Sequence, residues 1–248
     1  MTAALKTELR KLLSVRSTYI VTALVLLLVI IISGYGAGWR LSGRELSDPT
    51  QFLSDIFGAL NLVVFGAVIA VLLVTHEYRY NTIMYSLTIS NSRGKVLLAK
   101  AVTISIYALV LTVLLAILSP LAAYAGVHLA GNVLAPQTIH FGDVIWRSLF
   151  FGWAYGMAGL LLATLIRSQV GAIAALFLVP GVVEQLLAEL FGNNAVYLPF
   201  TALRQLLNTA PASAAGTLTP AKGAFVFGIY LVVGWVIAWF LFLRRDAN

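Results

Sequence analysis

The pair His76-Glu77 is the feature of this sequence that comes nearest to a catalytic motif, because a histidine followed by a glutamate begins the HExxH pattern of zinc proteases. That pattern needs a second histidine one helical turn after the first, so that both imidazoles face the metal ion. Tyr80 occupies that position here, so the zinc ligand set is incomplete. We therefore do not expect protease chemistry at this pair.

A second group of possible metal ligands lies further along the chain. His128 and His140 stand near Asp143, and three side chains of these types can together bind a metal ion. They flank a stretch with Gly131 and Pro136 that is typical of an irregular loop, where a histidine commonly has no role in chemistry. We expect no metal site on this chain.

Nucleotide-binding and nucleophile motifs are also incomplete. Gly94-Lys95 is similar to the end of a phosphate-binding loop, but Val96 follows where Ser or Thr is needed, and Ile89 stands where the first glycine is needed. No serine lies in a GxSxG sequence, and the chain has no cysteine, which excludes disulfides, thiolate metal sites and a cysteine nucleophile. We expect neither a catalytic residue nor a bound cofactor on this chain.

The composition indicates the class of protein that these residues belong to. Of the 248 residues, 60% are hydrophobic and 10% are charged, whereas a soluble domain is about 45–50% apolar and about 25% charged. Only an integral membrane protein fits these values. The formal net charge of +7 does not indicate a nucleic-acid partner, because no basic stripe is interleaved with aromatic residues. The expected partner is the lipid bilayer.

Six apolar runs are long enough to cross the hydrocarbon core, which needs about 20 residues of helix. The sequence therefore predicts an all-α integral membrane protein, with residues 1–248 forming a single transmembrane domain. The predicted spans are residues 18–38, 52–75, 101–124, 144–166, 170–191 and 224–243.

The distribution of Lys and Arg predicts how these spans are oriented. The segments before the first span, between the second and third, between the fourth and fifth, and after the sixth all lie on one side of the membrane. They contain eleven basic residues, whereas the segments on the opposite side contain five. Cytoplasmic loops carry the excess of Lys and Arg in membrane proteins. We therefore predict a multi-pass protein of the cell membrane with both termini in the cytoplasm.

Three segments outside the spans have their own patterns. Residues 1–17 place leucines at helical spacing among basic residues, which predicts an amphipathic helix in the inner interface, although a long first span with a basic flank is the alternative. Residues 76–100 form a polar cytoplasmic segment that is longer than a simple connection needs. Residues 192–223 are expected on the outer side as a partly helical segment, because Leu203, Leu206 and Leu207 recur at helical spacing.

Three residues inside the predicted spans are candidates for a special role. Glu184 is an acid well inside the fifth span, and Pro180 one turn earlier can kink that helix. Glu184 either faces the interior of the bundle or lies in the outer headgroups because the span ends sooner. Asn61 in the second span is suited to a hydrogen bond between helices.

The polar segment 76–100 resembles the loop after the second span in membrane subunits of ABC exporters of type 2, the ABC type-2 permease family. Glu77, Thr82, Arg93 and Lys100 stand at the offsets of that family's loop pattern. The pattern departs at two positions, which are Asn81 where the family usually has Gly and Ser90 where it often has Pro. The resemblance extends to the layout of six spans with an N-terminal interfacial helix.

The resemblance implies that the segment is a coupling helix held in a cleft of a separate ABC ATPase subunit, which binds the ATP and Mg. By the resemblance, the candidate ATPase-coupling residues are Glu77, Arg79, Thr82, Arg93 and Lys100. The alternative is that the basic residues only fix the orientation of the spans in the membrane. Glu77 would have no function in that case, because only Lys and Arg fix the orientation. The family also works in pairs, which implies a homodimer or a pairing with a related permease.

The resemblance further implies that the first, second and fifth spans line a central path, which makes Asn61, Pro180 and Glu184 candidate pathway-lining residues. The expected function is therefore that of a permease subunit in an ATP-driven exporter. Two other functions stay open at this point: a membrane scaffold or regulator without transport, and a membrane enzyme that modifies lipids. The sequence does not indicate the transported substrate.

Overall fold

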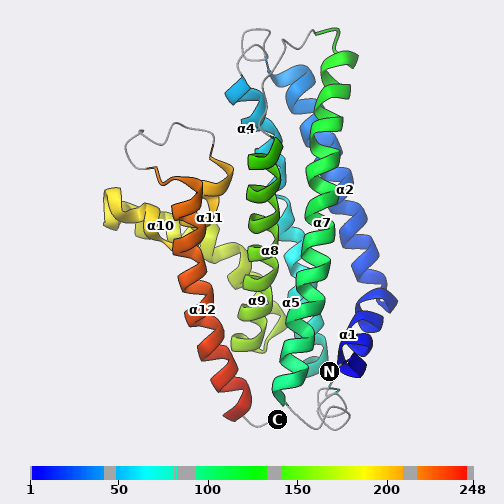
Figure 1. Ribbon diagram of the computed structural model, residues 1–248, viewed down its shortest axis with the longest axis vertical. Helices are drawn as coiled ribbons and strands as arrows, with labels where there is room; N and C mark the ends of the chain where they lie inside the picture. The colour runs from blue at the N-terminus through cyan, green and yellow to red at the C-terminus, as the bar shows by residue number, and fades with distance from the viewer. Residues whose placement is uncertain are drawn as a thin grey trace.

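The computed structural model describes residues 2–41, 49–80, 82, 93–132, 141–208 and 217–244, and every regular element in these ranges is a helix (Figure 1). Among the described residues, six helical runs are long and apolar enough to cross a membrane. These runs are Arg16–Arg40, Ile56–Arg79, Gly94–Leu129, Gly142–Ile166, Gln169–Tyr197 and Pro220–Arg244. The predicted all-α fold with six candidate spans is confirmed.

The N-terminal segment forms a helix of its own before the first span. Helix α1 (Thr2–Ser14) ends at Val15, whose extended backbone separates it from α2 (Arg16–Tyr35). A short π-helical turn, Gly36–Arg40, completes the first span. The start of α1 and the end of α12 (Pro220–Arg244) lie at the same end of the bundle, as an even number of crossings requires (Figure 1).

The second span is not the single helix predicted for residues 52–75. It consists of α4 (Pro49–Leu60) and α5 (Val63–Arg79), joined by a turn at Asn61. The Asn61 side-chain amide donates to the Gly58 carbonyl oxygen at 3.2 Å, within its own segment. Asn61 is exposed among the described residues, so in this chain its amide satisfies the end of α4 rather than a neighbouring helix.

The third span extends well beyond the predicted residues 101–124. Helix α7 (Arg93–Leu129) has 37 residues and contains Pro120, which gives it a length of about 55 Å at 1.5 Å per residue. The predicted polar segment 76–100 is therefore helical at both of its ends, where α5 finishes at Arg79 and α7 begins at Arg93.

The fifth span, predicted for residues 170–191, is broken at Pro180, the residue that was expected to be able to kink it. Helix α9 (Gln169–Leu178) passes through a π-helical turn at Val179–Val183 into α10 (Glu184–Phe191). Figure 1 shows α10 lying across the axis of the bundle rather than along it. Pro180 is in the turn, and because proline has no backbone N–H it disrupts the regular helical hydrogen bonding there.

The segment between the fifth and sixth spans is partly helical, as predicted. It contains a 3₁₀ turn (Gly192–Tyr197), α11 (Pro199–Arg204) and a second 3₁₀ turn (Gln205–Leu207). Ala202, Leu203 and Leu206 are fully buried, because this segment folds back against the bundle.

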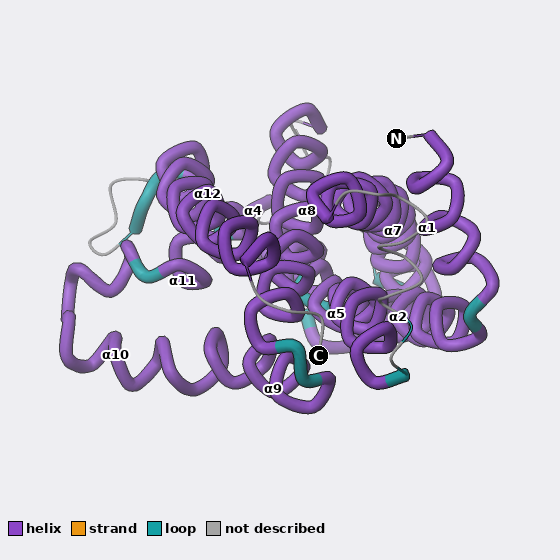
Figure 2. The backbone as a smooth tube through the Cα atoms, turned by 90° about the horizontal axis from the view of Figure 1, so that it is seen from below, coloured by secondary structure: helices purple, strands orange, loops and turns teal. Residues whose placement is uncertain are grey.

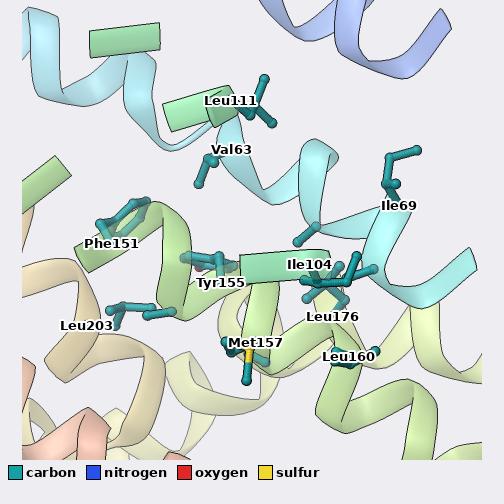
Figure 3. Close-up of a cluster of buried hydrophobic side chains, with 14 of the residues drawn as sticks. Val63, Ile69, Ile104, Leu111, Phe151, Tyr155, Met157, Leu160, Leu176 and Leu203 are labelled. Carbon is teal, nitrogen blue, oxygen red and sulfur yellow. The ribbon is translucent and has the colours of Figure 1, made fainter. Parts of the chain in front are cut away.

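The core lies around α5 and α8 (Phe141–Ile166), which stand between α1, α2 and α7 on one side and α10, α11 and α12 on the other (Figure 2). In the most apolar part of α8, 61% of the residues are buried, compared with 22% in that of α12. Large side chains from several helices meet at this centre (Figure 3). They include Val63, Ile69, Ile104, Leu111, Phe151, Leu160, Leu176 and Leu203.

The end of α2 and the turn that follows it cross α7 at backbone contact, because glycines lie on both sides. A Cβ on Gly38 would come within 2.5 Å of the Gly126 carbonyl oxygen, and a Cβ on Gly126 would overlap the Gly34 carbonyl. Earlier along both helices, the hydroxyls of Ser33 in α2 and Ser119 in α7 form a hydrogen bond of 2.8 Å. Small residues at a helix crossing permit this approach in membrane proteins.

Gly126→Ala is expected to lower the free energy of unfolding by about 1–3 kcal/mol, because the added methyl group forces α2 away from α7. The matched control is Gly228→Ala, another glycine inside a helix, where an added Cβ meets nothing within 4 Å. The control should leave stability unchanged or raise it slightly. Denaturation of the purified protein in detergent measures both, and equal behaviour of the two variants would contradict the crossing described here.

Candidate functional site

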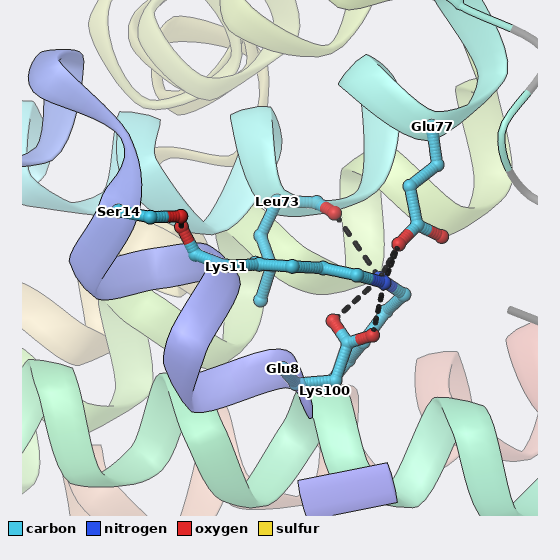
Figure 4. Close-up of polar contacts among 6 residues, drawn as sticks. All are labelled: Glu8, Lys11, Ser14, Leu73, Glu77 and Lys100. Carbon is cyan, nitrogen blue, oxygen red and sulfur yellow. Dashed lines mark hydrogen bonds and ion pairs between the residues drawn. The ribbon is translucent and has the colours of Figure 1, made fainter. Parts of the chain in front are cut away.

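Four charged side chains from three helices meet at the end of the bundle where α1 lies (Figure 4). Glu8 and Lys11 come from α1, Glu77 from the last turn of α5, and Lys100 from α7. Lys11 Nζ lies 2.7 Å from Glu8 Oε1 and 2.5 Å from Glu77 Oε1. Lys100 Nζ lies 2.8 Å from Glu8 Oε2 and 2.9 Å from Glu77 Oε1. We call these four residues the charge cluster.

Three of the four side chains in the charge cluster are buried. The side chain of Lys100 is 1% exposed, that of Glu8 4% and that of Glu77 7%, whereas Lys11 is 34% exposed. Lys100 Nζ also donates to the Leu73 carbonyl oxygen at 3.2 Å. Two positive and two negative groups balance, which is what allows ionised side chains to be buried.

The sequence of α1 turns Glu8 and Lys11 toward the bundle. Residues three and four apart lie on one face of a helix, so Glu8, Lys11 and Leu12 share a face. Glu8 and Leu12 are buried, while Lys6 and Arg10 on the other side of α1 are exposed. The helix is therefore held to α5 and α7 by charge as well as by apolar contact.

Lys11 remains protonated in this setting. Burial alone would lower its pKa, but the hydrogen bonds and charges of Glu77 and Glu8 outweigh it and raise the pKa of Lys11 above its ordinary value. Because the pKa of Lys11 is raised in the folded state, the stability that its ion pairs contribute is fully present at neutral pH. This stability is lost only as the pH rises through the pKa of Lys11 in the folded protein. The link from α1 to α5 therefore holds across the physiological range.

The structure brings together two of the predicted coupling residues, Glu77 and Lys100. Both are covered by helices of this chain, so in this conformation they fix the ends of α5 and α7 to α1 and do not present a surface to another subunit. Glu8 and Lys11 were not predicted as site residues. The only signal for them in the sequence is an acid placed three residues before a lysine in an otherwise basic helix.

The other predicted coupling residues lie at the boundary of the described chain. Arg79 and Thr82 are exposed. Arg79 Nη1 donates to Gln169 Oε1 at 3.3 Å, which joins α5 to α9, and the Thr82 backbone N–H donates to the Glu77 carbonyl oxygen at 2.9 Å. Arg93 is the first residue of α7, and its side chain is outside the described residues. Asn81, Ser90 and His140 are also outside them.

A second buried polar site lies at the kink of the fifth span. Glu184 is 2% exposed, and its carboxylate accepts from the backbone N–H groups of Phe200 at 2.7 Å and Thr201 at 2.6 Å. The Thr201 hydroxyl donates to the same carboxylate at 2.8 Å. Glu184 is therefore buried and holds the first turn of α11, where unpaired amides and the helix dipole favour a negative charge.

Arg204, at the other end of α11, completes this site. Its Nη2 donates to the Pro180 carbonyl oxygen at 2.5 Å, and its side chain also interacts with Tyr155 of α8. The disrupted backbone of the kink is thus satisfied by a side chain from the folded-back segment. Pro180 and Glu184 are both occupied by these contacts, and their role as pathway-lining residues stays a prediction, as does that of Asn61.

Metal ligands do not gather in groups of three or more His, Asp or Glu side chains anywhere in the part of the chain that the structure describes. The charge cluster and the kink site contain lysine, arginine and hydrogen-bonded carboxylates, which suit structural linkage rather than bond-breaking chemistry. The arrangement therefore connects helices.

Comparison with known proteins indicates the family of the chain. A search of curated proteins found no match to the chain. The sequence pattern of the ABC-2 family transporter proteins matches residues 4–184, a stretch that includes most of α1, the charge cluster, the first four spans and the kink of the fifth. Members of that family are membrane components of transporters and are not themselves catalytic. Because the match covers well over half of the 248 residues, the chain belongs to the ABC-2 family of transporter membrane proteins.

Proposed function

We propose that the chain is the permease subunit of an ATP-driven exporter and works as a dimer with separate ATPase subunits. Membership of the ABC-2 family supports the permease role, and such a permease needs an ATPase partner. The phosphate-binding motif is incomplete at Gly94-Lys95, which agrees with ATP and Mg being bound on that partner.

The single observation that carries this proposal is the position of the charge cluster. Its members on α5 and α7, Glu77 and Lys100, stand near the two ends of residues 76–100, the connection that resembles a coupling loop. A force on that connection would pass directly into the ends of α5 and α7. Because Glu8 and Lys11 join both ends to α1, the three helices would move as one unit.

The proposed orientation follows from the excess of basic residues at the α1 end. Lys6, Arg10 and Arg16 are exposed there, and Arg244 ends the last described helix at the same end (Figure 1). By the positive-inside rule we place this end in the cytoplasm, where an ATPase subunit would reach residues 80–92.

Dimerisation is supported by the outer surfaces of the late spans. In the most apolar parts of Gln169–Tyr197 and Pro220–Arg244 only 22% of the residues are buried, which leaves most of their surface to lipid or to a second permease. We propose a second copy or a related permease as the partner for part of this surface.

Co-purification with the ABC ATPases of the same organism tests the function. We expect an ATPase to co-purify with the tagged chain, and we expect the double variant Arg79→Ala with Thr82→Ala to weaken that binding at least about fivefold, because both side chains are exposed beside the connection. The matched control is Lys222→Ala, an exposed residue at the opposite end of the bundle. If no ATPase binds the folded chain, the exporter function is wrong, and a scaffold or regulatory role takes its place.

A further inference from the structure

The exposed charge at the α1 end of the bundle is entirely positive within the described residues. The acids described at this end, Glu8 and Glu77, are both buried in the charge cluster, where Lys11 and Lys100 neutralise them. No described acid is therefore left on the surface to offset the exposed cations. These cations are Lys6, Arg10, Arg16, Arg79, Lys95 and Arg244. A negatively charged surface is the partner that complements this end of the molecule.

The cations of α1 lie on the side of the helix that faces away from the bundle. Lys6 and Arg10 are four residues apart, so they share one face and are separated by about 6 Å along the helix axis. Glu8 and Leu12 are buried on the opposite face. Neither Lys6 nor Arg10 has an ion-pair partner in the part of the chain that the structure describes. The positive-inside rule does not require this arrangement, because it concerns the number of cations near a span and not the helix face that carries them.

Apolar side chains are exposed next to these cations, at the elbow where α1 meets α2. Leu13 is 57% exposed, Tyr19 58% and Ile20 64%. The Tyr19 hydroxyl donates to the Leu13 carbonyl oxygen at 2.6 Å, which joins the two helices at the elbow. Because the first span begins at Arg16, the elbow lies where hydrocarbon gives way to headgroups. Cations beside exposed apolar side chains at this depth are typical of a helix that contacts anionic lipid.

We propose that Lys6, Arg10 and Arg16, which we call the basic surface, bind the headgroups of anionic phospholipids in the leaflet around α1. A Lys or Arg near a membrane surface strengthens binding to anionic lipid about fivefold. The proposal goes beyond the proposed function, because it depends on the bilayer and not on an ATPase. The charge cluster joins α1 to α5 and α7, so the lipid composition of this leaflet would act on the helices next to the proposed coupling segment.

Quenching of a fluorophore on α1 by nitroxide-labelled lipids tests the proposal. The chain has no cysteine, so Ser14→Cys provides a single thiol at an exposed position one turn after Arg10. The labelled full-length chain is placed in phosphatidylcholine nanodiscs that contain a small fraction of nitroxide lipid, either phosphatidylglycerol or phosphatidylcholine with the same nitroxide acyl chain. We expect phosphatidylglycerol to quench about fivefold more efficiently. Salt at about 1 M should remove the difference, because it screens exposed charges.

Two double variants that remove the same charge make the test specific. Lys6→Gln with Arg10→Gln should reduce the preference for phosphatidylglycerol to less than about twofold. Arg40→Gln with Lys222→Gln removes two exposed cations from the opposite end of the spans and should leave the preference unchanged.

Equal quenching by the two lipids, or a preference that survives Lys6→Gln with Arg10→Gln in folded protein, would overturn the proposal. Loss of a co-purifying ATPase in that variant, without any lipid preference in the parent chain, would show that the basic surface binds protein and would also overturn it. The nanodisc measurement contains no ATPase, so its outcome is independent of the proposed exporter function.

Discussion

Lys100→Met is expected to lower the free energy of unfolding by about 3–5 kcal/mol. The Lys100 side chain is 1% exposed and is the partner of both Glu8 and Glu77, so its removal leaves a buried excess of negative charge. Methionine keeps most of the length and apolar contact of the lysine, so the loss reports the charge. Denaturation in detergent, followed by the fluorescence of the five tryptophans, measures it.

Two further variants separate charge balance from other causes. Lys95→Met removes an exposed lysine from the same turn region of α7 and should change stability by less than about 0.5 kcal/mol. Adding Glu8→Gln to Lys100→Met leaves Lys11 and Glu77 as a balanced pair and should recover about half of the loss. If the double variant is as unstable as the sum of the single ones, the four residues do not act as one cluster.

Glu184→Ala is expected to lower the free energy of unfolding by about 2–4 kcal/mol, because the buried N–H groups of Phe200 and Thr201 lose their acceptor. The first turn of α11 would then have no partner, and the folded-back segment would separate from the kink. Limited proteolysis between α11 and α12 should therefore become faster in this variant.

Glu189→Ala is the matched control, because Glu189 lies on the same helix but is exposed. It should leave both stability and proteolysis unchanged. Glu184→Gln should lie between the two, since its amide oxygen can accept one of the hydrogen bonds that the carboxylate accepts. Equal losses for Glu184→Ala and Glu189→Ala would show that the carboxylate does not hold α11.

The fold was largely predictable because it depends on local composition. The lengths of the apolar runs indicate the spans, and the basic flanks indicate which ends lie together. The breaks were harder to predict. Pro180 indicates a kink, but the direction in which α10 turns depends on contacts with α11 that are far away in the sequence.

The charge cluster shows more clearly what could not be predicted from the sequence. Glu77 and Lys100 were predicted as site residues, but their partners on α1 are 66 to 92 residues away along the chain. A charged residue on an amphipathic helix normally faces water or headgroups. Only the packing of α1 against α5 and α7 shows that Glu8 faces inward.

A cross-link from residue 82 tests the central claim most directly. The chain has no cysteine, so Thr82→Cys provides a single reactive thiol at an exposed position beside the proposed coupling segment. Labelled with a maleimide photo-cross-linker, it should form a covalent product with the co-purified ATPase, while Lys222→Cys at the opposite end should form none. A product from Lys222→Cys alone, or none from Thr82→Cys in a complex that contains the ATPase, would contradict the proposed coupling end.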